Sequence, residues 1–103
     1  MDLNYKVKRF REIATSLADL YEKKNHNYGD SFGKLYSDLG PISGLVPLHN
    51  KLDRATSLIK GDTNHFESLE DTLKDLASYA IMNLIELEAH REEEDDGQYA
   101  RDR

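Results

Sequence analysis

Apolar residues recur along the first part of the chain at the spacing of a helix with one buried face. Between Leu3 and Lys24 they fall three or four positions apart, at Val7, Phe10, Ile13, Ala14, Leu17, Leu20 and Tyr21. Residues 25–30, with the sequence Asn-His-Asn-Tyr-Gly-Asp, then collect types that favour turns. The pattern predicts a first helix that ends at about Lys24, followed by a reversal or bend.

Two helices are predicted in the middle of the chain. Ser31 is a suitable N-cap for a short helix over residues 32–39, which a Gly-Pro pair should end. A further helical turn is expected at Ile42 to Val46. Pro47 lacks an amide donor and clashes with the preceding turn, so we expect it to start or kink the next helix, which ends at Gly61. Apolar residues of that helix keep helical spacing: Leu48, Leu52, Ala55 and Ile59.

The longest predicted helix follows a polar linker at residues 62–66. Ser68 with Asp71 three positions later forms a capping-box pattern at its start, and the lack of proline and glycine lets it run to about Glu92. Its apolar stripe consists of Leu69, Leu73, Leu76, Ala77, Ala80, Ile81, Leu84 and Leu87. Residues 92–103 open with a block of like charges that repel one another, which predicts a disordered acidic tail.

These elements define the expected fold class, an all-α compact bundle of about four helices. A chain of 103 residues has the size of one domain, and we assign residues 1–91 to a single helical domain and residues 92–103 to the tail. The charged fraction is high, at 33%, but the 38% of apolar residues are clustered with a helical period. This clustering favours amphipathic helices over disorder.

Charge and composition exclude several function classes. Of the net charge of −6, residues 92–103 contribute −4, through six acids and two arginines, and the rest of the chain contributes −2. A near-neutral body offers no basic face for nucleic acid, and it also disfavours a DNA mimic with carboxylates over the whole fold. No cysteine is present and the four histidines lack ligand spacing, so a structural zinc site is not expected. No leader-like or membrane-spanning apolar run occurs, which predicts a cytoplasmic protein with no membrane partner.

The most specific chemical signal is a pair of carboxylates. Asp71 and Asp75 are spaced i, i+4, which places both on one face of the last helix, one turn apart. Such a pair can share Mg²⁺, which prefers oxygen ligands and completes its shell with water and substrate phosphates. In the alternative interpretation Asp71 caps the helix and Asp75 is solvated or paired with Lys74 or Arg54.

Other candidates could hold a nucleotide. In the predicted loop, Tyr28 could stack on a base, while Gly29 and Asp30 could present backbone amides to a phosphate; alternatively, this loop only closes one end of the bundle. Lys51 and Arg54, spaced i, i+3, could grip phosphate or could form a salt-bridged outer face.

Tyr79, which follows Asp75 by one helical turn, could hydrogen-bond a ligand or anchor packing through its ring. No set of nucleophile, base and orienting residue is found in the sequence, so covalent catalysis has no support.

Three segments carry a resemblance to a known family. These are KNHNYGDSF at residues 24–32, KLDR at residues 51–54 and ESLEDTLKDLASYAIM at residues 67–82. Together they resemble the nucleotide modification associated domain 1 family over about residues 20–88. That family is small, occurs largely in phages and bacteria, and is tied to nucleotide or base modification mainly by the neighbourhood of its genes. The resemblance implies a helical fold and a nucleotide-related ligand.

More distantly, the last helix is similar to the metal-binding helix of all-α nucleoside triphosphate pyrophosphatases of the MazG and dimeric dUTPase type. Those enzymes use Glu-x-x-Glu on one helix and Glu-x-x-Asp on a later one to bind Mg²⁺. Here Asp75 matches the final aspartate, but Thr72 stands in the place of the glutamate. The preceding helix offers Lys51 and Arg54 and no Glu-x-x-Glu. The resemblance thus implies an incomplete metal motif.

Two functional hypotheses follow. The first is a nucleotide-binding domain of phage nucleotide metabolism or base modification, with Mg²⁺ as cofactor and pyrophosphatase-like hydrolysis as an open question. The second is a non-catalytic phage module that sequesters a nucleotide signal or inhibits a host defence protein in the host cytoplasm. Under either, we expect a homo-oligomer, because so small a bundle leaves apolar surface exposed.

Overall fold

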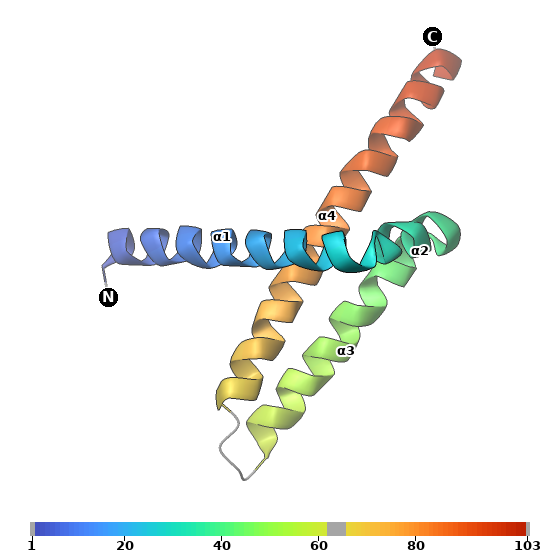
Figure 1. Ribbon diagram of the computed structural model, residues 1–103. Coiled ribbons are helices and arrows are strands. Elements are labelled where there is room, and N and C mark those ends of the chain that lie inside the picture. The colour runs from blue at the N-terminus through green and yellow to red at the C-terminus, as the bar shows by residue number, and fades with distance from the viewer. Residues whose placement is uncertain (1, 62–65, 103) are drawn as a thin grey trace. The chain divides into compact units, whose positions relative to one another are not determined.

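A computed structural model describes residues 2–61 and 66–102, with side chains described outside residues 27, 28, 66, 67 and 93–102. Within these ranges the chain forms four helices and no strand (Figure 1). They are α1 (Leu3–Tyr28), α2 (Ser31–Leu39), α3 (Pro41–Lys60) and α4 (Phe66–Asp102). The predicted all-α class with four helices is therefore confirmed.

The chain divides into two units, residues 1–31 and residues 32–103. The first consists of α1 and the turn after it, and the second contains almost all of α2 together with α3 and α4. The assignment of residues 1–91 to a single domain stays a prediction.

Helix α1 is longer than its apolar pattern predicted. It begins after Asp2, whose side chain accepts a hydrogen bond from the amide of Asn4 at 2.9 Å, and it ends at Gly29 rather than at Lys24. Gly29 has φ of +74° and donates its amide to the carbonyl of Asn25 at 2.8 Å. Gly29 adopts the positive φ that ends the helix, and glycine does so at low cost. Residues 25–28, which favour turns, need no such conformation and continue the helix.

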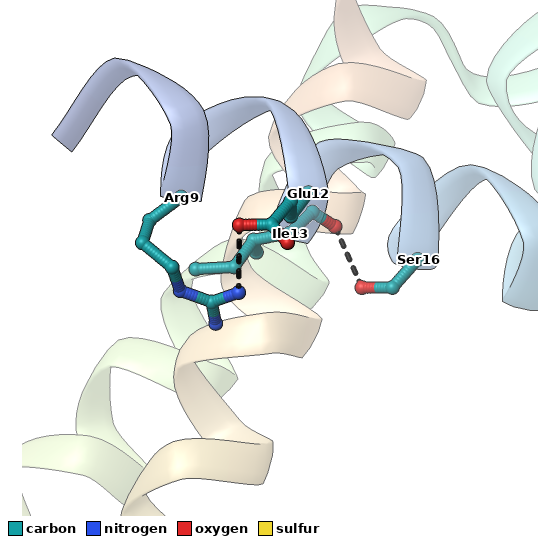
Figure 2. A network of polar contacts seen from close by, with 4 residues as sticks. All are labelled: Arg9, Glu12, Ile13 and Ser16. Carbon is teal, nitrogen blue, oxygen red and sulfur yellow. Dashed lines mark hydrogen bonds and ion pairs between the residues drawn. The ribbon is translucent and has the colours of Figure 1, made fainter. Parts of the chain in front are cut away.

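Two of the described polar contacts on α1 join side chains to neighbouring residues of the same helix. Figure 2 shows the ion pair between Arg9 and Glu12, at 3.3 Å, and the hydroxyl of Ser16 donating to the carbonyl of Ile13 at 2.7 Å. Both join residues three positions apart, the spacing at which side chains meet on one helix face. The ion pair is exposed, so it contributes little to stability.

Helix α3 does not start at Pro47, which was one of the two outcomes predicted for this residue; a kink at Pro47, the other outcome, stays a prediction. The turn at residues 42–46 and the helix after it form one continuous element, with Pro47 inside it. The helix starts instead at Pro41, where the missing amide would have had no helical partner, directly after Gly40 with φ of +86°. Pro47 removes one backbone hydrogen bond, to the carbonyl of Ser43, and this loss does not end the helix.

Helix α4 starts earlier and ends later than predicted. It begins at Phe66, so Ser68 is not an N-cap but lies inside the helix, where its carbonyl accepts the Thr72 hydroxyl at 2.7 Å. The linker at residues 62–65 lies outside the described residues. At the other end, the backbone stays helical past Glu92 to Asp102. Elongating an existing helix costs far less than nucleating one, so the acidic block extends α4. Disorder of the tail in solution stays a prediction.

Helices α3 and α4 form an antiparallel hairpin (Figure 1). Near the start of α3, the Asn83 amide donates to the carbonyl of Gly44 at 2.8 Å. Further along α3, Lys51 meets Asp75 at 2.9 Å. The two helices approach closely at Gly44, because a Cβ added there would overlap the Asn83 side chain.

The two long sides of this hairpin differ in chemistry. In an antiparallel helix pair, residues one position after the contact residues of either helix lie on the same side of the pair. On α3 those positions include Leu45 and Leu52, and on α4 they include Leu73 and Leu84. Residues one position before the contacts lie on the opposite side, and they include Arg54 and Asp71. The hairpin therefore has an apolar face and a polar face.

Candidate functional site

The polar face of the hairpin brings two of the predicted site residues together. Lys51 of α3 and Asp75 of α4 form an ion pair with 2.9 Å between Nζ and Oδ2. Their side chains are 36% and 37% exposed, so both remain accessible to a solute. An ion pair with this exposure is worth about 0–1 kcal/mol, because water screens it and each long side chain loses rotamer freedom. The pair can open to a ligand at little cost.

Arg54 and Asp71 extend this pair by one helical turn on each helix. Arg54 follows Lys51 by three residues and Asp71 precedes Asp75 by four, and in an antiparallel hairpin both shifts lead toward the α3–α4 connection. Both side chains are exposed. Among the side chains that the structure describes, Arg54 and Asp71 form no ion pair with each other. The result is a four-residue charged cluster, with two cations on α3 and two carboxylates on α4.

The ligands that the charged cluster offers to Mg²⁺ are two carboxylates, Asp71 and Asp75, which lie one helical turn apart on α4. Mg²⁺ is commonly held by one or two carboxylates plus substrate phosphates, so Asp71 and Asp75 suffice in number. The Lys51 ammonium competes for Asp75. Among the residues whose side chains the structure describes, no group of three or more His, Asp or Glu residues could hold a metal ion. Two carboxylates alone would leave most of the metal's shell to water and phosphate.

Thr72 stands one residue after Asp71 and does not point at this cluster. Its side chain is buried, 5% exposed, and its hydroxyl donates to the Ser68 carbonyl at 2.7 Å. Ala55 on α3 is buried as well. Thr72 therefore belongs to the packed interior of the hairpin, and the position where a glutamate would complete Glu-x-x-Asp adds no carboxylate to the polar face.

Tyr79 lies one turn beyond Asp75 and belongs to a row of rings shared by α2 and α4. Its ring centroid is 6.1 Å from that of Phe32, which is 6.4 Å from Tyr36. Tyr36 is 3% exposed and lies 5.1 Å from the His90 ring. Such tilted pairs are a favoured aromatic geometry, so the partly exposed Tyr79 ring is held in place at the edge of the cluster.

Asn83 is a positioning residue of this region that the sequence did not single out. Its amide donates both to the Gly44 carbonyl and to the Tyr79 carbonyl, each at 2.8 Å, and so ties α3 to the turn of α4 that carries Tyr79. An asparagine inside an otherwise apolar stretch of a helix was the available signal, because buried amides need partners.

The remaining predicted site residues lie in the unit of residues 1–31. Tyr28 is the last residue of α1, and its side chain lies outside those described. Gly29 takes the left-handed backbone conformation, and the exposed Asp30 makes a further interaction within the described structure. Convergence of Tyr28, Gly29 and Asp30 with Lys51, Arg54 and Tyr79 on one ligand stays a prediction.

Comparison with known families identifies the chain. Residues 24–87 match nucleotide modification associated domain 1, a span that covers more than half of the chain and includes the whole charged cluster. The protein belongs to this family. The comparisons with curated proteins and with solved structures found no match.

Membership of the nucleotide modification associated domain 1 family confirms the resemblance in the three sequence segments, all of which overlap the matched span. The name associates the domain with nucleotide modification and specifies neither a ligand nor a reaction. Among the described residues, no helix is both long and apolar enough to cross a membrane.

Proposed function

We propose that this protein is a nucleotide-binding domain that recognises the phosphates of its ligand on the polar face of the α3–α4 hairpin. The observation that carries the proposal is the half-exposed Lys51–Asp75 pair, because it joins two helices and places a cation and a carboxylate on a surface open to solvent. The family name supports the ligand class. Phosphate needs cations, and Lys51 and Arg54 supply a point charge and a bidentate fork one turn apart.

In the bound state, Lys51 turns from Asp75 to a phosphate oxygen. The exchange is nearly neutral in free energy, since an exposed pair contributes about 0–1 kcal/mol and a charge-assisted phosphate contact replaces it. Asp75, released from Lys51, together with Asp71 could then hold Mg²⁺ that is also bound to the phosphates. The Tyr79 ring, fixed by Phe32, offers a stacking surface for a base.

Binding without hydrolysis is favoured over pyrophosphatase activity by the packing of Thr72. That side chain is buried and bonded to the Ser68 carbonyl, so the metal cluster lacks the carboxylate that pyrophosphatases place there. Sequestration of a nucleotide signal in the cytoplasm of a phage-infected host fits a site that binds and does not turn over. Inhibition of a host protein is the second candidate role, and it would need no nucleotide.

The test measures nucleotide binding by calorimetry with a panel of ribo- and deoxyribonucleoside mono- and triphosphates, with and without Mg²⁺. For a nucleotide that binds, Lys51→Met and Arg54→Met should each weaken affinity at least tenfold, because each removes one cation from the phosphates. Lys60→Met, an exposed lysine in the last turn of α3, is the matched control and should bind like the wild type. Equal loss in all three variants would indicate nonspecific charge attraction and contradict the assignment of the site.

Hydrolysis is measured on the same panel by chromatography. Release of pyrophosphate from one triphosphate, lost in Asp75→Asn, would establish an enzyme and overturn the preference for binding alone. Unchanged nucleotides together with measurable affinity would support a sequestering domain. Absence of affinity for every nucleotide would refute the proposed function and leave the host-protein role.

A further inference from the structure

Lys51 neutralises one of the two carboxylates in the charged cluster and leaves the other open. Its Nζ lies 2.9 Å from Oδ2 of Asp75, whereas Asp71 is exposed and has no ion-pair partner among the described side chains. Lys74, the neighbour of Asp75 on α4, pairs instead with Glu70 at 3.3 Å. The cation on Asp75 therefore comes from the opposite helix of the hairpin.

The Lys51 ammonium and a divalent cation need the same oxygen atoms. Lys51 must leave Asp75 before this carboxylate can bind Mg²⁺, and Asp71 alone offers a single protein ligand. We propose that Lys51 is a built-in competitor of the metal, which disfavours a free divalent cation at Asp75 and admits it together with phosphate. This inference rests on the proposed function, because phosphate is the anion that draws Lys51 away.

Repulsion between like charges makes the binding of the two ligands mutually dependent. A metal ion that binds alone meets the two cations of α3, and a phosphate that binds alone meets the two carboxylates of α4. When both bind, the metal compensates the carboxylates and the phosphate compensates the cations. Each ligand thus removes the repulsion that the other meets, and by linkage each raises the affinity of the other by the same factor.

The exposure of the Lys51–Asp75 pair limits the size of the competition. Its side chains are 36% and 37% exposed, and breaking a pair in such surroundings changes an equilibrium by up to about fivefold. A displaced Lys51 stays attached to α3 and repels the metal, an effect that water reduces to about another twofold. Removal of the ammonium group should therefore raise the affinity for a free divalent cation by about tenfold.

The first test titrates the full-length protein with Mn²⁺ alone and follows the free ion by electron paramagnetic resonance, since Mn²⁺ shares the preference of Mg²⁺ for oxygen ligands. Lys51→Met should bind Mn²⁺ about tenfold more tightly than the wild type, and Lys51→Arg, which keeps the charge, should not. Asp75→Asn added to Lys51→Met should abolish the gain. Lys74→Met is the matched control, because it removes a charge next to Asp75 without opening the Lys51 pair, and it should change the affinity less than about threefold.

The second test uses a nucleotide that binds in the calorimetric panel. Mn²⁺ should raise its affinity by a factor several-fold larger in the wild type than in Lys51→Met, because only the wild type has Lys51 to remove from Asp75. Equal Mn²⁺ affinity of the wild type and Lys51→Met, or an equal gain in Lys74→Met, would overturn the competition, whatever the nucleotide does. Absence of nucleotide binding beside a tenfold Mn²⁺ gain in Lys51→Met would instead refute the proposed function and leave Lys51 as a competitor of the metal.

Discussion

Replacement of Gly44 by alanine tests the closest approach between α3 and α4. A Cβ at this position would overlap Oδ1 of Asn83 and would lie 3.1 Å from both Asn83 Cγ and Cδ2 of Tyr36. Tyr36 is buried, so only the Asn83 side chain has room to move. When it moves, it gives up its hydrogen bonds to the Gly44 and Tyr79 carbonyls.

The expected magnitude follows from three terms of different sign. Alanine in a helix interior is favoured over glycine by about 1 kcal/mol. Two lost hydrogen bonds cost about 1 kcal/mol each, and crowding against Tyr36 costs about 1 kcal/mol more, at the lower end for overpacking. Gly44→Ala should therefore lower the free energy of unfolding by about 2 kcal/mol, although the same change stabilises most helices.

Urea unfolding followed by circular dichroism, at one fixed protein concentration, measures the effect. With a slope near 1.5 kcal/mol per molar urea, the midpoint should fall by roughly 1 M. Ser57→Ala is a matched control on α3, because Ser57 is exposed and its replacement adds no contact. It should shift the midpoint by much less.

A double-mutant cycle decides whether Asn83 is the cause. In an Asn83→Ala background the space opposite residue 44 is open, so Gly44→Ala should cost little or stabilise, with a coupling energy of roughly 2 kcal/mol. A Gly44→Ala protein more stable than the wild type, with the same gain in the Asn83→Ala background, would refute the close approach of the two helices.

Three further outcomes are expected from the described contacts. Tyr36→Ala should lower the free energy of unfolding by about 3–5 kcal/mol in the same urea assay, because it empties the ring position against Phe32 and His90; a loss under 1 kcal/mol would show that this ring row is not packed. Asp2→Ala should cost about 1 kcal/mol by removing the N-cap of α1, seen as faster amide hydrogen exchange in its first turn, while Asp2→Asn should retain protection. Lys51→Met should change the free energy of unfolding by less than about 1 kcal/mol, and a larger loss would mean that the pair with Asp75 is structural and not available to a ligand.

The sequence predicted the number and order of the helices, because each helix carries its own stripe of apolar residues. The apolar stripes located all four helices, but the ends were misplaced where a single backbone position decides them. Gly29 rather than the turn-favouring residues before it ends α1, and Pro47 is carried inside α3. The combined propensity of several residues is a weak guide where the backbone conformation of one residue sets the boundary.

The candidate site was predictable in its members but not in its pairing. Helical spacing placed Asp71 with Asp75 and Lys51 with Arg54, since spacing within one helix is a local property. That Lys51 faces Asp75, and that Thr72 is buried, depends on how α3 lies along α4. Asn83 escaped notice for the same reason, because the Gly44 carbonyl that it contacts on α3 is known only once the helices are paired.

The balance of charges in the four-residue charged cluster has a consequence for salt dependence. Lys51 and Arg54 are matched by Asp71 and Asp75, so the cluster as a whole carries no net charge. Salt then has little long-range attraction to screen, and an anionic ligand of this face should lose less affinity with rising ionic strength than a ligand of a site built from cations alone.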